Sequence, residues 1–228
     1  MIAIVTGGCS GLGLNYTLEL LKKGYKVYAL YNTSFETASI LEKKYVNVKC
    51  VKCDIRDEND IISFLNEIDS VDLLINNAAL EMDNNFKDKT KYEFMNVLET
   101  NIFGTFAMMK YVYDKMNNNG IIINMSSNNA IDNYNPISMD YDASKAAINI
   151  LTKDFAEVYK EKNVKVFSIC PGYINTESVK SMNPNYLKEE MDKVNQTCLI
   201  EPDRLVNYIF DNLDNFETAS INVIKEVK

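Results

Sequence analysis

The 228-residue sequence contains no histidine, and this absence removes several kinds of chemistry. A Ser-His-Asp triad, a His-Glu-x-x-His zinc site and an imidazole base all require that residue. Acid–base chemistry near neutral pH must therefore use a Tyr, Lys, Asp, Glu or Cys with a shifted pKa. Apolar runs of about 18 residues are also missing, so no transmembrane helix is expected.

Cysteine is scarce and scattered. The five cysteines are odd in number and widely spaced, which is not the pattern of a disulfide framework. Cys50 and Cys53 have the spacing of a metal-binding pair, but their segment alternates like a strand, so they should point to opposite faces. We expect no metal site and small reduced thiols, as in the cytoplasm. The opening residues lack the basic region of a signal peptide.

Positively charged residues are outnumbered: the chain has 24 Lys and Arg against 32 Asp and Glu, which gives a net charge of −8. Such a chain has no net attraction for phosphate backbones, so we expect neither nucleic acid nor a membrane as partner. Hydrophobic residues make up 46% and charged residues 25%, as in ordinary globular proteins. No linker or internal repeat interrupts the chain, which indicates one domain over residues 1–228.

Seven strand-like runs alternate with amphipathic helical stretches. Most runs are continuous and apolar, as in strands buried on both faces of a sheet: Ile2–Thr6, Lys26–Leu30, Val46–Lys52, Leu73–Asn76, Gly120–Met125, Val164–Cys170 and Ser220–Ile224. Two longer helical patterns cover Lys91–Met116 and Tyr141–Lys162. The alternation predicts an α/β fold, a Rossmann-type doubly wound parallel sheet of about seven strands with helices on both faces.

Glycine is scarce too, yet four of the eight glycines are clustered near the N-terminus. They follow the first strand and open a helix, which is the context of a dinucleotide fingerprint. Glycine permits a sharp turn and the close approach of a pyrophosphate, and the helix N-terminus offers unpaired N–H groups. An ordinary glycine-rich turn is the alternative. The expected cofactor contacts here are Gly7, Gly8, Cys9, Ser10, Gly11, Leu12 and Gly13.

The end of the second strand bears on the choice of cofactor. It reads Tyr31, Asn32, Thr33 and Ser34, with no carboxylate to bind a ribose or repel a 2′-phosphate. Three small hydrogen-bonding side chains can hold that phosphate, so NADP(H) is favoured over NAD(H). Neither of the two arginines lies in this segment. NAD(H) and a solvated loop are the alternatives.

The sharpest chemical signal is a tyrosine four residues before a lysine. Tyr141 and Lys145 begin a helical pattern and share one face of it, where a nearby ammonium can lower a phenol pKa of about 10. Two surface residues on a helix would give the same pattern. Ser126 and Ser127 end a strand upstream, at the carboxyl edge where such sheets bind ligands.

These motifs, from residue 1 to about 210, resemble the short-chain dehydrogenase/reductase superfamily, in its short single-domain branch of 3-oxoacyl-reductase-like members. The resemblance implies hydride transfer between a nicotinamide cofactor and a carbonyl or alcohol. It also implies a catalytic tetrad. Tyr141 would move the proton, Lys145 would lower its pKa and hold the ribose, Ser127 would bond the substrate oxygen, and Asn101 would hold a relay water. Ser126 is the alternative serine.

The resemblance places further residues against the cofactor, after the third, fourth and sixth strands. They are Asp54 and Ile55 at the adenine edge, Asn77 and Ala78 along the wall, and Pro171, Gly172, Ile174 and Thr176 near the carboxamide and phosphates. Asn175–Ile200 would be a short substrate lid. Family members form homodimers or homotetramers and act on small carbonyl or alcohol substrates. A dinucleotide-binding regulator with little turnover, or an adaptor with a vestigial site, is the alternative.

Overall fold

The computed structural model describes residues 1–131 and 133–227. Its centre is a seven-stranded sheet with the order β3-β2-β1-β4-β5-β6-β7, and its six neighbouring strand pairs are parallel. The strands are β1 (Ile2–Thr6), β2 (Lys26–Tyr31), β3 (Val48–Lys52), β4 (Val71–Asn76), β5 (Met116–Met125), β6 (Lys165–Pro171) and β7 (Ile221–Ile224). The predicted fold class is confirmed.

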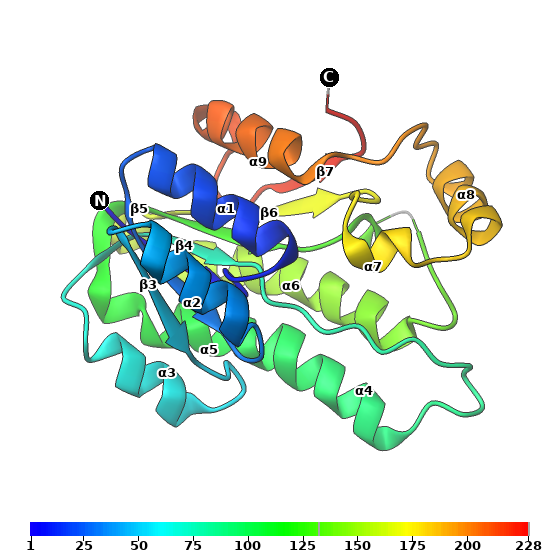
Figure 1. Cartoon of the computed structure of the whole chain (residues 1–228), viewed down its shortest axis with the longest axis horizontal. Helices are drawn as coiled ribbons and strands as arrows, with labels where there is room; N and C mark the ends of the chain where they lie inside the picture. The colour runs from blue at the N-terminus through cyan, green and yellow to red at the C-terminus, as the bar shows by residue number, and fades with distance from the viewer. Residues whose placement is uncertain (132, 228) are drawn as a thin grey trace.

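Helices cover both faces of the sheet (Figure 1). On one face lie α1 (Gly11–Lys22), α2 (Phe35–Lys44) and α9 (Pro202–Asp211), and on the other lie α3 (Glu58–Leu65), α5 (Gly104–Tyr111) and α6 (Met139–Val158), with α4 (Lys91–Leu98) against α6. Each face has its own apolar core, with Tyr16 and Ile209 in one and Phe64 and Phe155 in the other. Strands between two such cores are apolar on both sides, which explains their continuous apolar runs.

The single long helix predicted over Lys91–Met116 is wrong. Helix α4 ends at Leu98, a π-helical turn follows over Glu99–Phe103, and α5 ends at Tyr111. Met116 already belongs to β5, where it pairs with Val71. The wide turn surrounds Asn101, whose polar side chain is fully buried and needs hydrogen-bond partners that a plain apolar helix would not supply.

The two cysteines of the Cys-x-x-Cys segment lie on opposite sides of the sheet. Cys50 packs against the core beneath α1 and α2, and Cys53 belongs to the core on the other face. Among residues 1–131 and 133–227, no group of three or more Cys, Asp or Glu side chains could hold a metal ion. None of the described helices has the length and apolar character needed to cross a membrane.

Beyond the carboxyl end of β6 the chain forms two short helices, α7 (Glu177–Lys180) and α8 (Pro184–Lys193). Both helices lie within Asn175–Ile200, the segment expected to form a substrate lid. In Figure 1 both helices lie past the tip of β6, on the side of the molecule where α6 begins. The segment between β4 and α4 runs along the same side, so irregular chain gathers at this end of the sheet.

Candidate active site

The carboxyl ends of the central strands open onto one cleft of about 1240 Å³. Pockets for drug-sized ligands hold about 300–1,000 Å³, so this cleft has room for a dinucleotide and a small substrate together. Most of the predicted site residues line it: Gly7, Ser10, Gly11, Leu12, Tyr31, Asn32, Thr33, Ser34, Asp54, Ile55, Asn77, Ala78, Ser127, Tyr141, Lys145, Pro171, Gly172, Ile174 and Thr176.

Four predicted residues do not line the cleft: Gly8, Cys9, Gly13 and Asn101. A Cβ atom on Gly8 would lie 2.9 Å from the Cβ of Ala29, and one on Gly13 would lie 2.1 Å from the Gly7 carbonyl oxygen. The Cys9 side chain is buried in the core under the loop. These three residues pack the loop against β2 and α1, because the loop must sit close to both to turn into the helix.

The N-terminus of α1 is open to an anion. Gly7 turns the chain with a φ of 65°, and the N-cap residue Ser10 makes no side-chain capping bond. The first turn of α1 contains no acidic residue. Helix α4, by contrast, is closed by a full capping box between Thr90 and Glu93. The free N–H groups and positive end of the α1 dipole therefore suit a pyrophosphate at this point of the cleft.

The adenine end of the cleft holds an arginine that sequence reasoning missed. Arg56 donates through Nε to Asp54 Oδ1 at 2.9 Å, and Asn32 donates to Asp54 Oδ2 at 3.3 Å. The hydrogen bond from Arg56 is the main reason that the pKa of the Asp54 carboxyl lies below its usual value. Neither arginine lies within Tyr31–Ser34, but the parallel sheet brings the end of β3 beside the end of β2. An Asp-x-Arg sequence after the third strand was the only available signal.

Three of the four residues expected to form a tetrad meet where β5 ends and α6 begins. Lys145 Nζ lies 5.3 Å from the centre of the Tyr141 ring and donates to the Met125 carbonyl at 2.8 Å. The Ser127 side chain shares a hydrogen bond with Tyr141. The Ser126 hydroxyl instead donates to the Lys145 backbone carbonyl at 2.9 Å. Both serines line the cleft, and Ser127 is the one that contacts the tyrosine.

Burial dominates the ionisation of this group. It raises the pKa of the Tyr141 phenol well above 10, the negative charge of Glu81 adds to the effect, and the bond with Ser127 opposes it. Burial also lowers the pKa of Lys145 to about 8. The predicted lowering of the Tyr141 pKa is therefore wrong for this arrangement, since the ammonium points to a backbone carbonyl. Tyr141 is protonated at neutral pH and suited to donating a proton.

The Asn101 side chain connects Leu80, in the segment after β4, with Ser144 in α6. Its Oδ1 accepts from the Leu80 N–H at 2.7 Å, and its Nδ2 donates to the Leu80 carbonyl and to Ser144 Oγ, both at 2.9 Å. Both amide protons are therefore used. A relay water at this position can bind Asn101 only through an oxygen atom.

The substrate end of the cleft is lined mostly by residues that sequence reasoning did not identify. They are Glu81, Met82, Asn128, Asn129, Asn135, Tyr173 and Tyr186. Glu81 follows the Asn-Asn-Ala-Ala motif directly, so a charged residue just past a strand was a usable signal. Tyr186 belongs to α8, Tyr173 follows the Pro-Gly pair, and the others come from turns and loops. Only their packing brings these residues to the cleft.

The sequence model that describes the short chain dehydrogenase family matches residues 1–187. The chain belongs to this family. It is an NAD(P)-dependent oxidoreductase that acts on CH–OH or C=O groups, as the named reductases among its relatives do. The resemblance stated from the sequence is confirmed.

Relatives and solved structures agree with this assignment. An acetoacetyl-CoA reductase of Rhizobium meliloti is 32% identical over 83% of this chain and 80% of its own. The 3-oxoacyl-[acyl-carrier-protein] reductase FabG of Staphylococcus aureus is 30% identical over the same shares. The structure of BdcA in complex with NADPH superposes with a TM-score of 0.87 at 18% identity, over 98% of this chain and 92% of that one, a likeness of fold.

Proposed function

We propose that the protein is an NADP(H)-dependent reductase of a small carbonyl compound, working through Asn101, Ser127, Tyr141 and Lys145. The observation that carries the proposal is the meeting of Ser127, Tyr141 and Lys145 in the cleft onto which the open N-terminus of α1 also faces. A hydride donor bound at α1 can reach along the strand ends to these side chains.

The bound nicotinamide would supply the hydride. Ser127 would donate a hydrogen bond to the carbonyl oxygen as negative charge develops on it. Tyr141, protonated at neutral pH, would transfer its proton to that oxygen. Lys145 would bind the nicotinamide ribose hydroxyls and replace the lost proton through a water held at an oxygen atom of Asn101. In the alcohol-oxidising direction the same groups would act in reverse.

The preference for NADP(H) rests on the adenine end. Tyr31, Asn32, Thr33 and Ser34 all line the cleft, and none is acidic. Asp54 is the carboxylate nearby, and its ion pair with Arg56 neutralises it. A 2′-phosphate would therefore meet hydroxyl and amide groups with little repulsion. The NADPH bound to BdcA supports the same preference.

We also propose a homo-oligomer in the cytoplasm. The five cysteines are free thiols, as a reducing compartment keeps them. Helices α4 and α6 expose Tyr92, Met95, Ile150 and Val158, which suits a face between two copies of the chain. Four further apolar residues nearby do not contribute to this face, because they are buried in the core of the chain itself: Met108, Met109, Val112 and Met116.

Calorimetric titration with NADPH and NADH tests the cofactor, since the chain has no tryptophan whose fluorescence could report binding. We expect tighter binding of NADPH. NADPH consumption with small ketones then tests turnover. Tyr141→Phe should lower kcat by about 10²- to 10⁴-fold while NADPH binding stays intact. Binding without turnover by the wild type would instead support the regulator, and binding of neither nucleotide would support the vestigial adaptor.

A further inference from the structure

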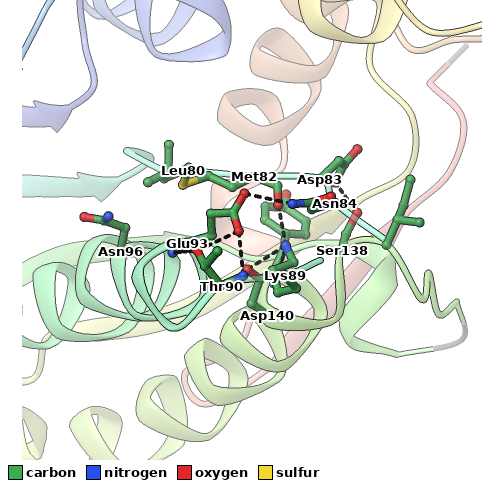
Figure 2. Close-up of polar contacts among 12 residues, drawn as sticks. Leu80, Met82, Asp83, Asn84, Lys89, Thr90, Glu93, Asn96, Ser138 and Asp140 are labelled. Carbon is green, nitrogen blue, oxygen red and sulfur yellow. Dashed lines mark hydrogen bonds and ion pairs between the residues drawn. The ribbon is translucent and has the colours of Figure 1, made fainter. Parts of the chain in front are cut away.

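The segment between β4 and α4, residues 77–90, forms a strap along the substrate end of the cleft. Helix α6, which carries Tyr141 and Lys145, holds this strap in place. Lys89 Nζ lies 3.0 and 2.9 Å from the two carboxylate oxygens of Asp140, at the start of α6. The two side chains are only 5% and 0% exposed. The same ammonium donates to the Met82 carbonyl, so one buried ion pair joins Met82 and the C-terminal part of the strap to α6 (Figure 2).

The strap is fixed on both sides of Glu81. Leu80, just before it, is bound through its N–H and its carbonyl by the buried amide of Asn101. Met82, just after it, is bound by Lys89. Asp83 accepts from Ser138 and adds a further link to the segment before α6 (Figure 2). The backbone of Glu81 is therefore held, and its carboxylate is presented to the cleft with little freedom.

Glu81 faces the reacting groups. It lines the cleft with Tyr141, Lys145 and Tyr173, and its charge acts on all three of them. Asp83 and Asp142 are the other charged groups that act on Glu81. Among the described residues that line the cleft, the basic side chains are Arg56, at the adenine end, and Lys145. The substrate end consequently combines one positive charge, beneath the tyrosine ring, with an acceptor carboxylate.

The rest of that end is made of neutral hydrogen-bonding groups. Asn128 is 2% exposed, and its Nδ2 has no partner among the described residues. The Tyr186 hydroxyl accepts from Asn135 at 2.8 Å and still has its own proton to donate. Tyr173 accepts from Asn133 in the same way at 3.3 Å. A buried amide nitrogen without a partner is unfavourable, so these groups indicate a polar ligand.

We propose that Glu81 is a substrate-recognition residue that accepts a hydrogen bond from a hydroxyl or ammonium group next to the reacting carbonyl. This inference rests on the proposed reductase function and adds the substrate class to it. The Ser138 hydroxyl hydrogen-bonds the Glu81 carboxylate, which keeps further acceptor positions. A bound ketone without such a donor would shield these positions from water without replacing their hydrogen bonds, which disfavours its transition state. The keto group of an acetoacetyl thioester has no adjacent donor, so this chain would differ in substrate from its relatives of that name.

The test compares two ketones of nearly equal size, hydroxyacetone and 2-butanone, which differ by a hydroxyl in place of a methyl group. In the wild type, kcat/KM with NADPH should favour hydroxyacetone by about tenfold to a hundredfold, the value of a hydrogen bond to a charged group. Glu81→Leu should remove the preference by lowering kcat/KM for hydroxyacetone relative to 2-butanone, and this ratio is the readout because the charge of Glu81 also acts on Tyr141 and Lys145 in the turnover of both ketones. Glu81→Gln, which keeps an acceptor oxygen, should retain part of it.

Glu157→Gln is the matched control, since it removes the same charge from an exposed position at the far end of α6. It should leave the ratio unchanged, and all variants should bind NADPH like the wild type. A Glu81→Leu enzyme that keeps the wild-type ratio overturns the inference while the reductase function stands. So does a wild type that prefers 2-butanone. An enzyme that reduces no ketone in the series overturns the proposed function, and this inference with it.

Discussion

The two ends of the cleft are built in different ways. The cofactor end consists of strand ends, a tight glycine turn and an uncapped helix N-terminus, and its Asp54 carboxylate is paired with Arg56. The substrate end consists of the strap, the segment before α6 and the short helices α7 and α8, and it is held by a buried ion pair. The cofactor end is thus formed mainly by backbone geometry, whereas the substrate end depends on particular side chains.

This difference explains where the recognisable motifs lie. A pyrophosphate needs N–H groups and close approach, which a Gly-rich turn provides in any protein of this fold. A substrate needs side chains that match its own groups, and these change from one enzyme to the next. The cofactor end is therefore common to proteins of this fold, whereas the substrate end is particular to each enzyme. The three predictions below test that comparison from the largest expected effect to the smallest.

The largest effect on stability should come from the ion pair of the substrate end. Lys89→Met leaves the fully buried Asp140 carboxylate unpaired, which costs about 3–5 kcal/mol of unfolding free energy. Urea unfolding measures the loss. In the folded fraction KM for ketones should rise, because the strap is released, while the Kd for NADPH should change little.

The double variant Lys89→Met/Asp140→Asn provides the control for this prediction. It removes both charges and should recover most of the lost stability. Equal losses in the single and double variants would mean that the pair contributes through packing alone. A weakened NADPH affinity would show that the two ends of the cleft are not independent.

At the cofactor end, Gly13→Ala should cost about 1–3 kcal/mol, because a Cβ there would lie 2.1 Å from the Gly7 carbonyl oxygen. It should also weaken NADPH binding, since the turn must open. Gly24→Ala is the matched control. Gly24 has a φ of 82° with open space around its Cβ position, so backbone strain alone should cost about 1 kcal/mol and leave NADPH binding intact. Equal NADPH affinities in the two variants would contradict the role of the turn.

The smallest effect should be a pH dependence from the substrate end. Burial and the charge of Asp83 raise the pKa of Glu81 to about 7, so the folded state holds this proton more tightly than the unfolded state. The contribution of Glu81 to stability is present below its unfolded pKa and is lost as pH rises toward 7. Between pH 5 and pH 8, the unfolding free energy of Glu81→Gln should therefore rise relative to that of the wild type. The rise should be less than about 1 kcal/mol, because water reaches the open cleft.

Urea unfolding of both proteins at the two pH values measures that gain. Lys145 has the opposite effect on stability at higher pH. Burial lowers its pKa to about 8, so the unfolding free energy rises as pH passes from 8 toward the pKa of this lysine in the unfolded state. Both proteins contain Lys145, so the part of its effect that does not depend on the charge of Glu81 cancels in the comparison. A stability difference that is the same at pH 5 and pH 8 would show that Glu81 is not perturbed.

Particular residues show how far the sequence could be interpreted. The parallel sheet and the residues of its strand ends were predicted, because continuous apolar runs and a Gly-rich turn depend on local pattern alone. The break at Asn101 was visible as a polar residue in an apolar helix, but its partners Leu80 and Ser144 were not. Arg56 was set aside because it lies far along the chain from Asn32, although strand pairing brings the two together.

By itself, the sequence determined the family, the fold, the tyrosine–lysine pair and most of the strand-end segments that line the cleft, since each depends on residues close together in the chain. Only the tertiary structure decided that Ser127 rather than Ser126 contacts Tyr141, that the phenol pKa is raised and that Glu81 enters the cleft. These features depend on burial and on contacts between residues far apart in sequence. Desolvation and distant charges have no local pattern, so they follow only from the packed fold.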